Sequence, residues 1–149
     1  MRSLDLADPA VLRTVWEIQR AAYAVEAELI GFDGIPGLHE SMAELRRCGE
    51  HFLGGEDESG IAGAVSWNVL DVGVIEICRL VVHPRAHRLG LASALLDALD
   101  AQMKPRRTIV STGTGNGPAL ALYQRRGFVP VGERTIAEGV TVTSLERIV

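Results

Sequence analysis

Cysteines and aromatic side chains are scarce in this sequence, and long apolar runs are absent. Its 149 residues include two cysteines and four histidines, and only 5% are aromatic. Cys48 and Cys78 lack the spacing of metal ligands, so both are predicted to be small core residues without a chemical role. No apolar run approaches the roughly 20 residues that span a bilayer, and residues 1–8 lack the apolar stretch of a signal peptide. These absences favour a metal-free protein outside the membrane, and by default a cytoplasmic one.

Two signatures of phosphate-rich ligands are also missing. No basic stripe with interleaved aromatics occurs, so nucleic acid is not an expected partner. No glycine-rich run ends in Gly-Lys-Ser or Gly-Lys-Thr, which excludes a nucleotide-binding P-loop.

The composition is that of one folded domain covering residues 1–149, with 47% hydrophobic and 23% charged residues. The overall charge of −4 is unevenly distributed: residues 1–74 carry 5 basic and 13 acidic side chains, a net of −8, and the remainder is +4. The second half therefore favours a polyanionic ligand and the first a cation. Solvated faces without a ligand are the alternative.

Turn residues and hydrophobic periodicity divide the chain into alternating helices and strands. An Asp8 cap followed by Pro9 predicts the start of the first helix. Helices are expected over residues 9–25, 38–47, 91–103 and 117–126. Strands are expected over residues 3–6, 52–56, 61–68, 72–82, 108–112, 128–134 and 140–148.

The order of these segments predicts a mixed α/β fold. Three consecutive strands form an antiparallel meander, and strand, helix, strand over residues 72–112 is a crossover that joins parallel neighbours. We therefore expect a central, mostly antiparallel twisted sheet with one parallel pair and helices on both faces.

The segment from Arg79 to Ala98 combines an apolar strand, a basic loop and an amphipathic helix. A helix start offers unpaired N–H groups and a positive dipole end, and Gly90 and Ala92 keep side chains away from that backbone. Arg85, His87 and Arg88 add basic donors. This arrangement predicts a phosphate site, although any strand-to-helix turn can carry a glycine.

The same segment resembles the acetyl-CoA pyrophosphate loop of the GNAT superfamily, whose pattern is Gln or Arg, two residues, Gly, one residue, then Gly or Ala. Gly90 and Ala92 match, whereas His87 stands where the family has Gln or Arg. A second block, Asn116-Gly117-Pro118-Ala119-Leu120-Ala121-Leu122-Tyr123-Gln124-Arg125-Arg126-Gly127-Phe128, resembles the family motif that carries a tyrosine and ends in Gly-Phe.

The resemblance implies an N-acetyltransferase that moves an acetyl group from acetyl-CoA to a primary amine by direct attack, without a metal. It implies a proton donor at Tyr123, for which a core tyrosine is the alternative, and a backbone oxyanion donor near Leu80 with a bulge and a splayed neighbouring strand. The cofactor-binding residues that it implies are Leu80, Val81, Val82, His87, Arg88, Leu89, Gly90, Leu91, Ala92, Ser93, Asn116 and Tyr123. Asn116 is equally well explained as a helix cap.

Glu76 lies in an otherwise apolar strand, where a charge is costly unless it is paired or used. Period two puts it on one face with Cys78, Leu80 and Val82. It is a candidate general base, as in some branches of the family, with a structural ion pair, for example to Arg79, as the alternative.

The acidic N-terminal half favours a cationic amine acceptor, and strands that end such folds often meet in a homodimer. The candidate acceptor contacts are Glu26, Glu28, His39, Glu40, Ser111 and Thr112. A non-catalytic acyl-CoA-binding sensor or interaction domain is the competing interpretation, which the presence of both Tyr123 and Glu76 disfavours.

Overall fold

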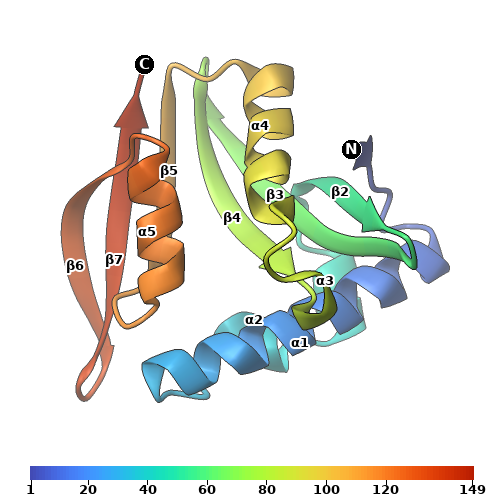
Figure 1. Cartoon of the computed structure of the whole chain (residues 1–149), viewed down its shortest axis with the longest axis horizontal. Coiled ribbons are helices and arrows are strands. Elements are labelled where there is room, and N and C mark those ends of the chain that lie inside the picture. The colour runs from blue at the N-terminus through green and yellow to red at the C-terminus, as the bar shows by residue number, and fades with distance from the viewer.

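The computed structural model describes residues 1–149, apart from the side chain of Pro36. Its seven strands form one sheet in the order β1-β2-β3-β4-β5-β7-β6 (Figure 1). The strands are β1 (Arg2–Ser3), β2 (His51–Asp57), β3 (Gly60–Asp71), β4 (Val74–Val82), β5 (Arg107–Gly113), β6 (Val129–Ala137) and β7 (Val140–Ile148). The helices are α1 (Pro9–Ile30), α2 (Pro36–His39), α3 (Met42–Arg46), α4 (Leu91–Met103) and α5 (Gly117–Arg125), with a 3₁₀ turn at Pro84–Ala86.

The strand directions confirm the predicted fold class. Every neighbouring pair is antiparallel except β4 and β5, which run parallel and are joined through α4. The bounds of α4 and β7 are those predicted from the sequence.

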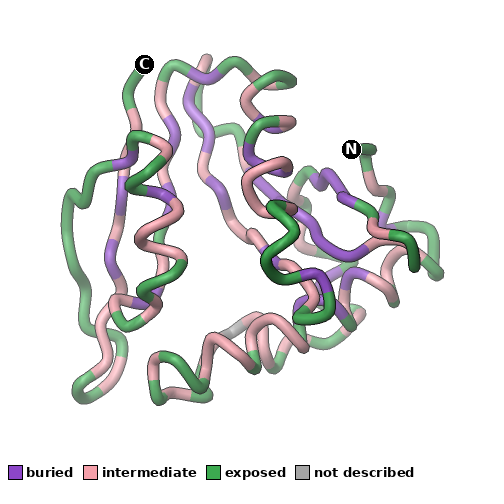
Figure 2. The backbone as a smooth tube through the Cα atoms, in the orientation of Figure 1, coloured by how far each residue is buried: buried purple, intermediate pink, exposed green. Residues whose placement is uncertain are grey.

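Helices cover both faces of the sheet, as expected. On one face, the buried leucines of α4 and Tyr123 of α5 pack with Ile75, Ile77 and Leu145 of the sheet. On the other, Val15 and Ile18 of α1 pack with a second set of sheet residues. Figure 2 shows the buried backbone concentrated in the central strands, whereas β6 at one edge is exposed over nearly all its length.

Three predicted elements differ most from the structure, and the bounds of most others shift by one to three residues. The expected first strand, residues 3–6, is reduced to Arg2–Ser3, and α1 continues five residues further than predicted, to Ile30, where Gly31 ends it with a φ of 66°. The helix expected over residues 38–47 is divided into α2 and α3. Ser41 causes the division because its side chain accepts from the Glu44 N–H while the Glu44 side chain accepts from the Ser41 N–H, which starts a new helix.

A bulge in β4 overturns the predicted face of Glu76. Ser66 of β3 pairs with Arg79, but the next residue, Trp67, pairs with Ile77, so Cys78 is an extra residue. Before the bulge, Ile75 and Ile77 face the α4 core; after it, Leu80 and Val82 do. Glu76 therefore does not share a face with Leu80 and Val82, because one inserted residue reverses the alternation.

None of the helices in the described part of the chain is both long and apolar enough to cross a membrane.

The α4 core carries a direct stability prediction. Leu95 is 0% exposed, so Leu95→Ala should lower the free energy of unfolding by about 2–5 kcal/mol through lost burial and a residual cavity. The control Leu70→Ala, at a position that is 53% exposed, should change it by less than about 0.5 kcal/mol. Urea unfolding measures both, and equal effects would contradict the packing described.

Candidate functional site

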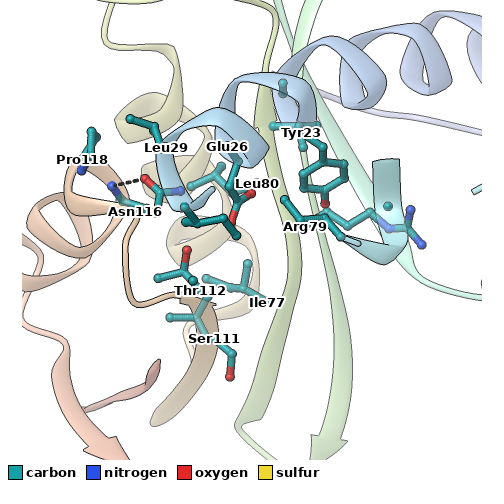
Figure 3. Close-up of a pocket in the computed structure, with 18 of the residues that line it drawn as sticks. Tyr23, Glu26, Leu29, Ile77, Arg79, Leu80, Ser111, Thr112, Asn116 and Pro118 are labelled. Carbon is teal, nitrogen blue, oxygen red and sulfur yellow. Dashed lines mark hydrogen bonds between the residues drawn. The ribbon is translucent and has the colours of Figure 1, made fainter. Parts of the chain in front are cut away.

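The central cleft of the molecule opens where β4 and β5 separate. Their pairing runs from Val74 and Arg107 to Ile77 and Val110 and then stops, although β4 continues to Val82 and β5 to Gly113. Beyond Ile77, β4 pairs on its β3 side alone. A cavity of about 850 Å³ occupies this region, lined by α1, β4, β5 and α5 together with residues of β6 and β7 (Figure 3). The predicted splay of these two strands is thus confirmed.

The helix start next to this cavity has the geometry of an anion site. Gly90 caps α4 in a left-handed conformation with a φ of 72°, and no side chain hydrogen-bonds the first N–H groups of the helix. A methyl group built on Gly90 would meet nothing within 4 Å, so the backbone there faces open space. Arg88 also has a positive φ, of 67°. Uncapped donors and a positive helix end suit a phosphate group.

The basic side chains of this loop are not equivalent. Arg85 donates to the Asp57 carboxylate at 3.0 Å and to the Ile61 carbonyl at 2.9 Å, so it holds the loop to β2 and β3 instead of facing the ligand space. His87 lines the cavity, as does Ala92.

Seven of the predicted cofactor contacts line the cavity: Leu80, Val81, Val82, His87, Ala92, Asn116 and Tyr123. The other five belong to the loop before α4 and to its first turn and are not among the lining residues: Arg88, Leu89, Gly90, Leu91 and Ser93.

Tyr123 faces the cavity from α5, yet its side chain is only 4% exposed. Its ring packs edge-on against Phe128, with the ring centroids 5.4 Å apart. Burial, reinforced by the nearby Tyr23 and Glu26, raises the pKa of Tyr123 above its ordinary value. The hydroxyl therefore keeps its proton and is a donor in neutral solution.

Asn116 confirms its predicted role as a helix cap. Its Oδ1 accepts the Ala119 N–H at 3.2 Å, which starts α5. Its side chain also lies near Glu26, a residue of α1 that lines the cavity.

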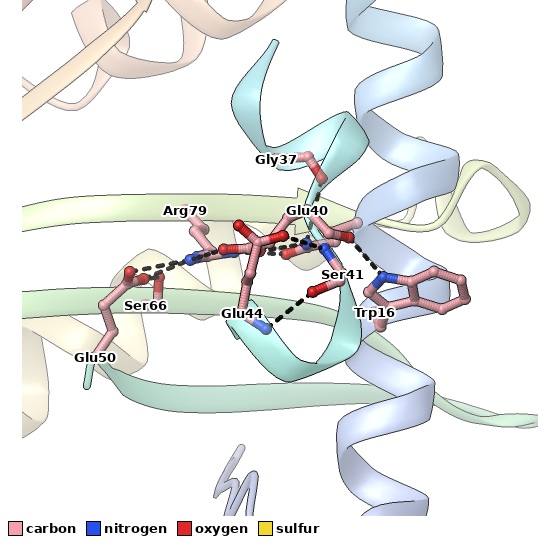
Figure 4. A network of polar contacts seen from close by, with 9 residues as sticks. Trp16, Gly37, Glu40, Ser41, Glu44, Glu50, Ser66 and Arg79 are labelled. Carbon is pink, nitrogen blue, oxygen red and sulfur yellow. Dashed lines mark hydrogen bonds and ion pairs between the residues drawn. The ribbon is translucent and has the colours of Figure 1, made fainter. Parts of the chain in front are cut away.

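A buried ion network forms the wall of the cavity on the α1 side (Figure 4). Arg79, at the bulge, donates to both oxygens of Glu50, at 2.8 and 3.1 Å, and to both oxygens of Glu40. It also donates to the Gln19 side chain of α1 at 2.9 Å. Five hydrogen bonds thus use all five guanidinium N–H groups. They tie β4 to α1, to the loop before α3 and to the residue that precedes β2.

The network fixes the charge of its members. Burial opposes ionisation of Glu50, but hydrogen bonds from Arg79 and Ser66 outweigh it and hold the pKa of Glu50 below its ordinary value. Burial likewise opposes the charge on Arg79, yet Glu50 and Glu40 raise the pKa of Arg79 further. The cluster carries one positive and two negative charges, a net of −1.

Glu76 belongs neither to the cavity nor to the Arg79 ion network. It is partly exposed, is not among the residues lining the cavity, and makes no ion pair among the described residues. The predicted partner Arg79 is occupied by Glu40 and Glu50 instead. Its predicted role as general base stays a prediction, and its position gives that role no geometric support.

The candidate acceptor contacts divide into two groups. Glu26, Glu40, Ser111 and Thr112 line the cavity, whereas Glu28 and His39 are exposed and outside it. Sequence reasoning missed Tyr23, Glu50 and Arg79 as members of this site. Arg79 alone gave a signal, as a charged residue in an apolar strand.

Of the two cysteines, only Cys78 departs from its predicted core position. Cys48 packs against the core beneath α1, but Cys78 lines the cavity. Burial, with the charges of Glu50 and Glu76, raises the pKa of Cys78 to about 12. A thiol that stays protonated is a poor nucleophile, so the prediction of no chemical role is consistent with its surroundings.

The described residues contain no group of three or more His, Cys, Asp or Glu side chains that could hold a metal ion.

Together, the splayed parallel pair, the uncapped helix behind a left-handed glycine and the tyrosine between them define an acyl-CoA-binding type of fold. The model of the acetyltransferase (GNAT) family matches residues 12–128, most of the chain, and the chain belongs to that family.

One curated relative is similar over most of this chain. The UPF0157 protein YqkA of Bacillus subtilis (strain 168) is 33% identical over 137 residues, which cover 91% of this chain and 40% of that protein. The chain therefore spans about 40% of the length of this curated relative.

Two solved acetyltransferases show the same fold. The ribosomal-protein-S18-alanine N-acetyltransferase from Escherichia coli superposes with a TM-score of 0.77 at 17% identity, covering 99% of this chain and 91% of that one. PaiA N-acetyltransferase from Thermoplasma acidophilum, in complex with coenzyme A, gives a TM-score of 0.76 at 18% identity, with coverages of 99% and 97%.

The ion network predicts a large cost for removing its cation. Arg79→Met leaves Glu40 and Glu50 as unpaired, mostly buried carboxylates, so the free energy of unfolding at neutral pH should fall by about 3 kcal/mol or more. Adding Glu40→Gln and Glu50→Gln to Arg79→Met should recover part of this loss. Urea unfolding of the single and triple variants measures it, and a neutral single variant would contradict the network.

The same network predicts an acid dependence. Because the pKa of Glu50 is lower in the folded than in the unfolded chain, ionised Glu50 stabilises the fold above the unfolded-state pKa. That contribution is lost as the pH falls below about 4 and through the folded-state pKa. Arg79→Met should flatten this part of the stability profile.

Proposed function

We propose that this chain transfers an acetyl group from acetyl-CoA to a primary amine. The single observation that carries the proposal is that Tyr123, buried and protonated, faces a cavity located where β4 and β5 separate. The uncapped start of α4 lies at the end of the loop that follows β4. A proton donor, a backbone edge and an anion site are thus arranged along one cleft.

The backbone of residues 88–93 would hold the pyrophosphate, since its N–H groups are uncapped and Gly90 faces open space. The edge of β4 around Leu80 and Val82, which has no partner strand on the β5 side, would pair with the pantetheine arm as an added strand does. Acetyl-CoA supplies the activated acyl group.

In direct transfer, the groups in the cleft act on the nucleophile, the carbonyl oxygen and the leaving sulfur. The amine nitrogen attacks the thioester carbonyl carbon, the C–N bond forms and the C–S bond breaks. A backbone N–H near Leu80 donates to the carbonyl oxygen as negative charge develops on it. Tyr123 gives its proton to the departing sulfur as the C–S bond breaks, and its raised pKa keeps the hydroxyl protonated until that step.

A cationic acceptor fits the electrostatics of the α1 side of the cavity. Glu26, Glu40 and Glu50 line this side, with Arg79 as the cation among them. Three carboxylates against one guanidinium attract an ammonium group and repel an anion. Neighbours that act on a ribosomal-protein alanine are consistent with an amine acceptor.

We also propose that residues 1–149 form a single domain and that the protein is a homodimer. Because the chain spans about 40% of its curated relative, a single domain and a homodimer both remain predictions for the whole protein.

An acceptor screen tests the proposal. Purified protein is incubated with acetyl-CoA and a linear polyamine, an amino sugar, or a peptide with a free N-terminal alanine, and free thiol release is followed. We expect release with at least one amine and none with acidic acceptors. Binding of acetyl-CoA without thiol release from any amine would instead identify a non-catalytic sensor or interaction domain.

Substitution of Gly90 tests the predicted anion site, and Gly139 provides a matched control. Gly90 and Gly139 both have left-handed backbone, with φ of 72° and 71°, and open space around them. Gly90→Ala and Gly139→Ala should lower stability by similar amounts of about 1 kcal/mol, since alanine disfavours this conformation. Calorimetric titration with CoA should show weaker binding for Gly90→Ala alone. Equal affinities of the two variants would move the pyrophosphate site elsewhere.

Tyr123→Phe tests the proton donor. Turnover should fall by about 10²-fold or more, with CoA affinity unchanged, because the ring and its packing remain and the hydroxyl alone is lost. Steady-state kinetics together with CoA titration separates the two quantities. Undiminished turnover across the pH range would rule out this role.

A further inference from the structure

Glu26 occupies a distinctive position among the carboxylates of the chain. It projects from the C-terminal part of α1 into the cavity, close to the end of β5 (Figure 3). Its Oε1 lies 3.7 Å from where a side chain on Gly113 would begin, and Ile30 of the same helix approaches that point to 3.0 Å. Glycine at position 113 therefore allows α1 to bring this carboxylate against the mouth of the splayed strands.

The other carboxylates near the cavity are either paired with a cation or lie outside the cavity. Glu40 and Glu50 are both held by the Arg79 guanidinium, which uses their oxygens as acceptors. Glu76 lies outside the cavity, and Glu28, two residues after Glu26, is exposed to solvent. Of the cavity carboxylates in the described residues, Glu26 is thus the one without an ion-pair partner.

The surroundings of Glu26 suit a group that exchanges a proton. Burial raises the pKa of Glu26, while hydrogen bonds from the Asn116 side chain and the Gly113 backbone act in the opposite direction. Neither neighbour is a cation, so neither fixes the charge of the Glu26 carboxylate. The titratable and charged groups that line the same cavity are Tyr23, Glu40, Glu50, Arg79, His87, Tyr123 and Arg134.

Glu26 and Tyr123 come from opposite sides of the cleft. Glu26 belongs to α1 and Tyr123 to α5, which pack on different faces of the sheet, and each lines the one cavity. The two are close enough for the Glu26 charge to contribute to the raised pKa of Tyr123. Acyl transfer to an ammonium group needs a base that deprotonates the nitrogen and an acid that protonates the leaving sulfur. Two such groups on opposite sides of one cavity meet this need.

We propose that Glu26 is the catalytic base, which takes the proton that an acceptor ammonium must lose before its nitrogen can attack. This inference rests on the proposed acetyl transfer. The N–H bond breaks and its proton passes to a Glu26 oxygen, which leaves a lone pair on nitrogen. That lone pair forms the C–N bond as the C–S bond breaks. Tyr123 protonates the sulfur, the second nitrogen proton restores Tyr123 through solvent, and Glu26 releases its proton to water.

Glu26→Gln tests the assignment with little change in side-chain shape. At neutral pH we expect kcat/KM for the amine to fall by about 10²-fold, with CoA affinity from calorimetry unchanged. The acidic limb of the pH profile of kcat/KM should disappear, which a merely structural role would not cause. Glu28→Gln, exposed on the same helix, is the matched control and should behave as wild type.

A second comparison uses the basicity of the acceptor. A primary alkylamine accepted in the screen is compared with its β,β,β-trifluorinated analogue, whose nitrogen is largely unprotonated at neutral pH. The defect of Glu26→Gln should be much smaller for the trifluorinated amine, because that nitrogen has no proton to lose before it attacks. A defect of equal size for both amines would overturn the assignment, as would retention of wild-type kcat/KM.

The outcomes separate this inference from the function on which it rests. Thiol release by the wild-type protein together with full activity of Glu26→Gln overturns the role of Glu26 alone. The absence of release by the wild-type protein with every amine overturns acetyl transfer itself. If Glu26→Gln retains acetyl-transfer activity and Glu76→Gln loses it, Glu76 is the catalytic base instead.

Discussion

The site depends on the failure of two parallel strands to stay paired. One extra residue, Cys78, shifts the register of β4 against β3, and pairing with β5 ends at Ile77. The bulge reverses which side chains face which helix layer, so Leu80 and Val82 join the α4 core while Arg79 turns toward α1. The cleft, the backbone edge and the ion network therefore all lie at or next to this one inserted residue.

Much of the fold could be predicted because its signals are local. The amphipathic period of α4, stopped before Pro105, and the β-branched run of β7 gave correct bounds, since propensity and burial agree in those segments. The division between α2 and α3 was missed because it depends on the reciprocal Ser41 and Glu44 bonds, which compete with a continuous helix.

The donor side of the site was more predictable than the acceptor side. Its residues lie in two continuous sequence motifs, in which the spacing along the chain is enough to predict their positions: Gly90 and Ala92 in one, and Tyr123 in the other. Glu26 and Glu50 reach the cavity only through the packing of distant elements, and a period-two reading of β4 placed Glu76 on the wrong face because a bulge leaves no mark in the sequence.

The fully used hydrogen-bond donors of Arg79 affect which acceptor molecules can enter the cavity. A guanidinium beside an open cavity would ordinarily attract carboxylates and phosphates, yet every N–H of this one already serves Glu40, Glu50 or Gln19. The residue acts as an internal counterion with no donor left over. An anionic compound entering from the α1 side would meet excess negative charge and no free hydrogen-bond donor from Arg79, so the fold filters acceptors by charge before any chemistry begins.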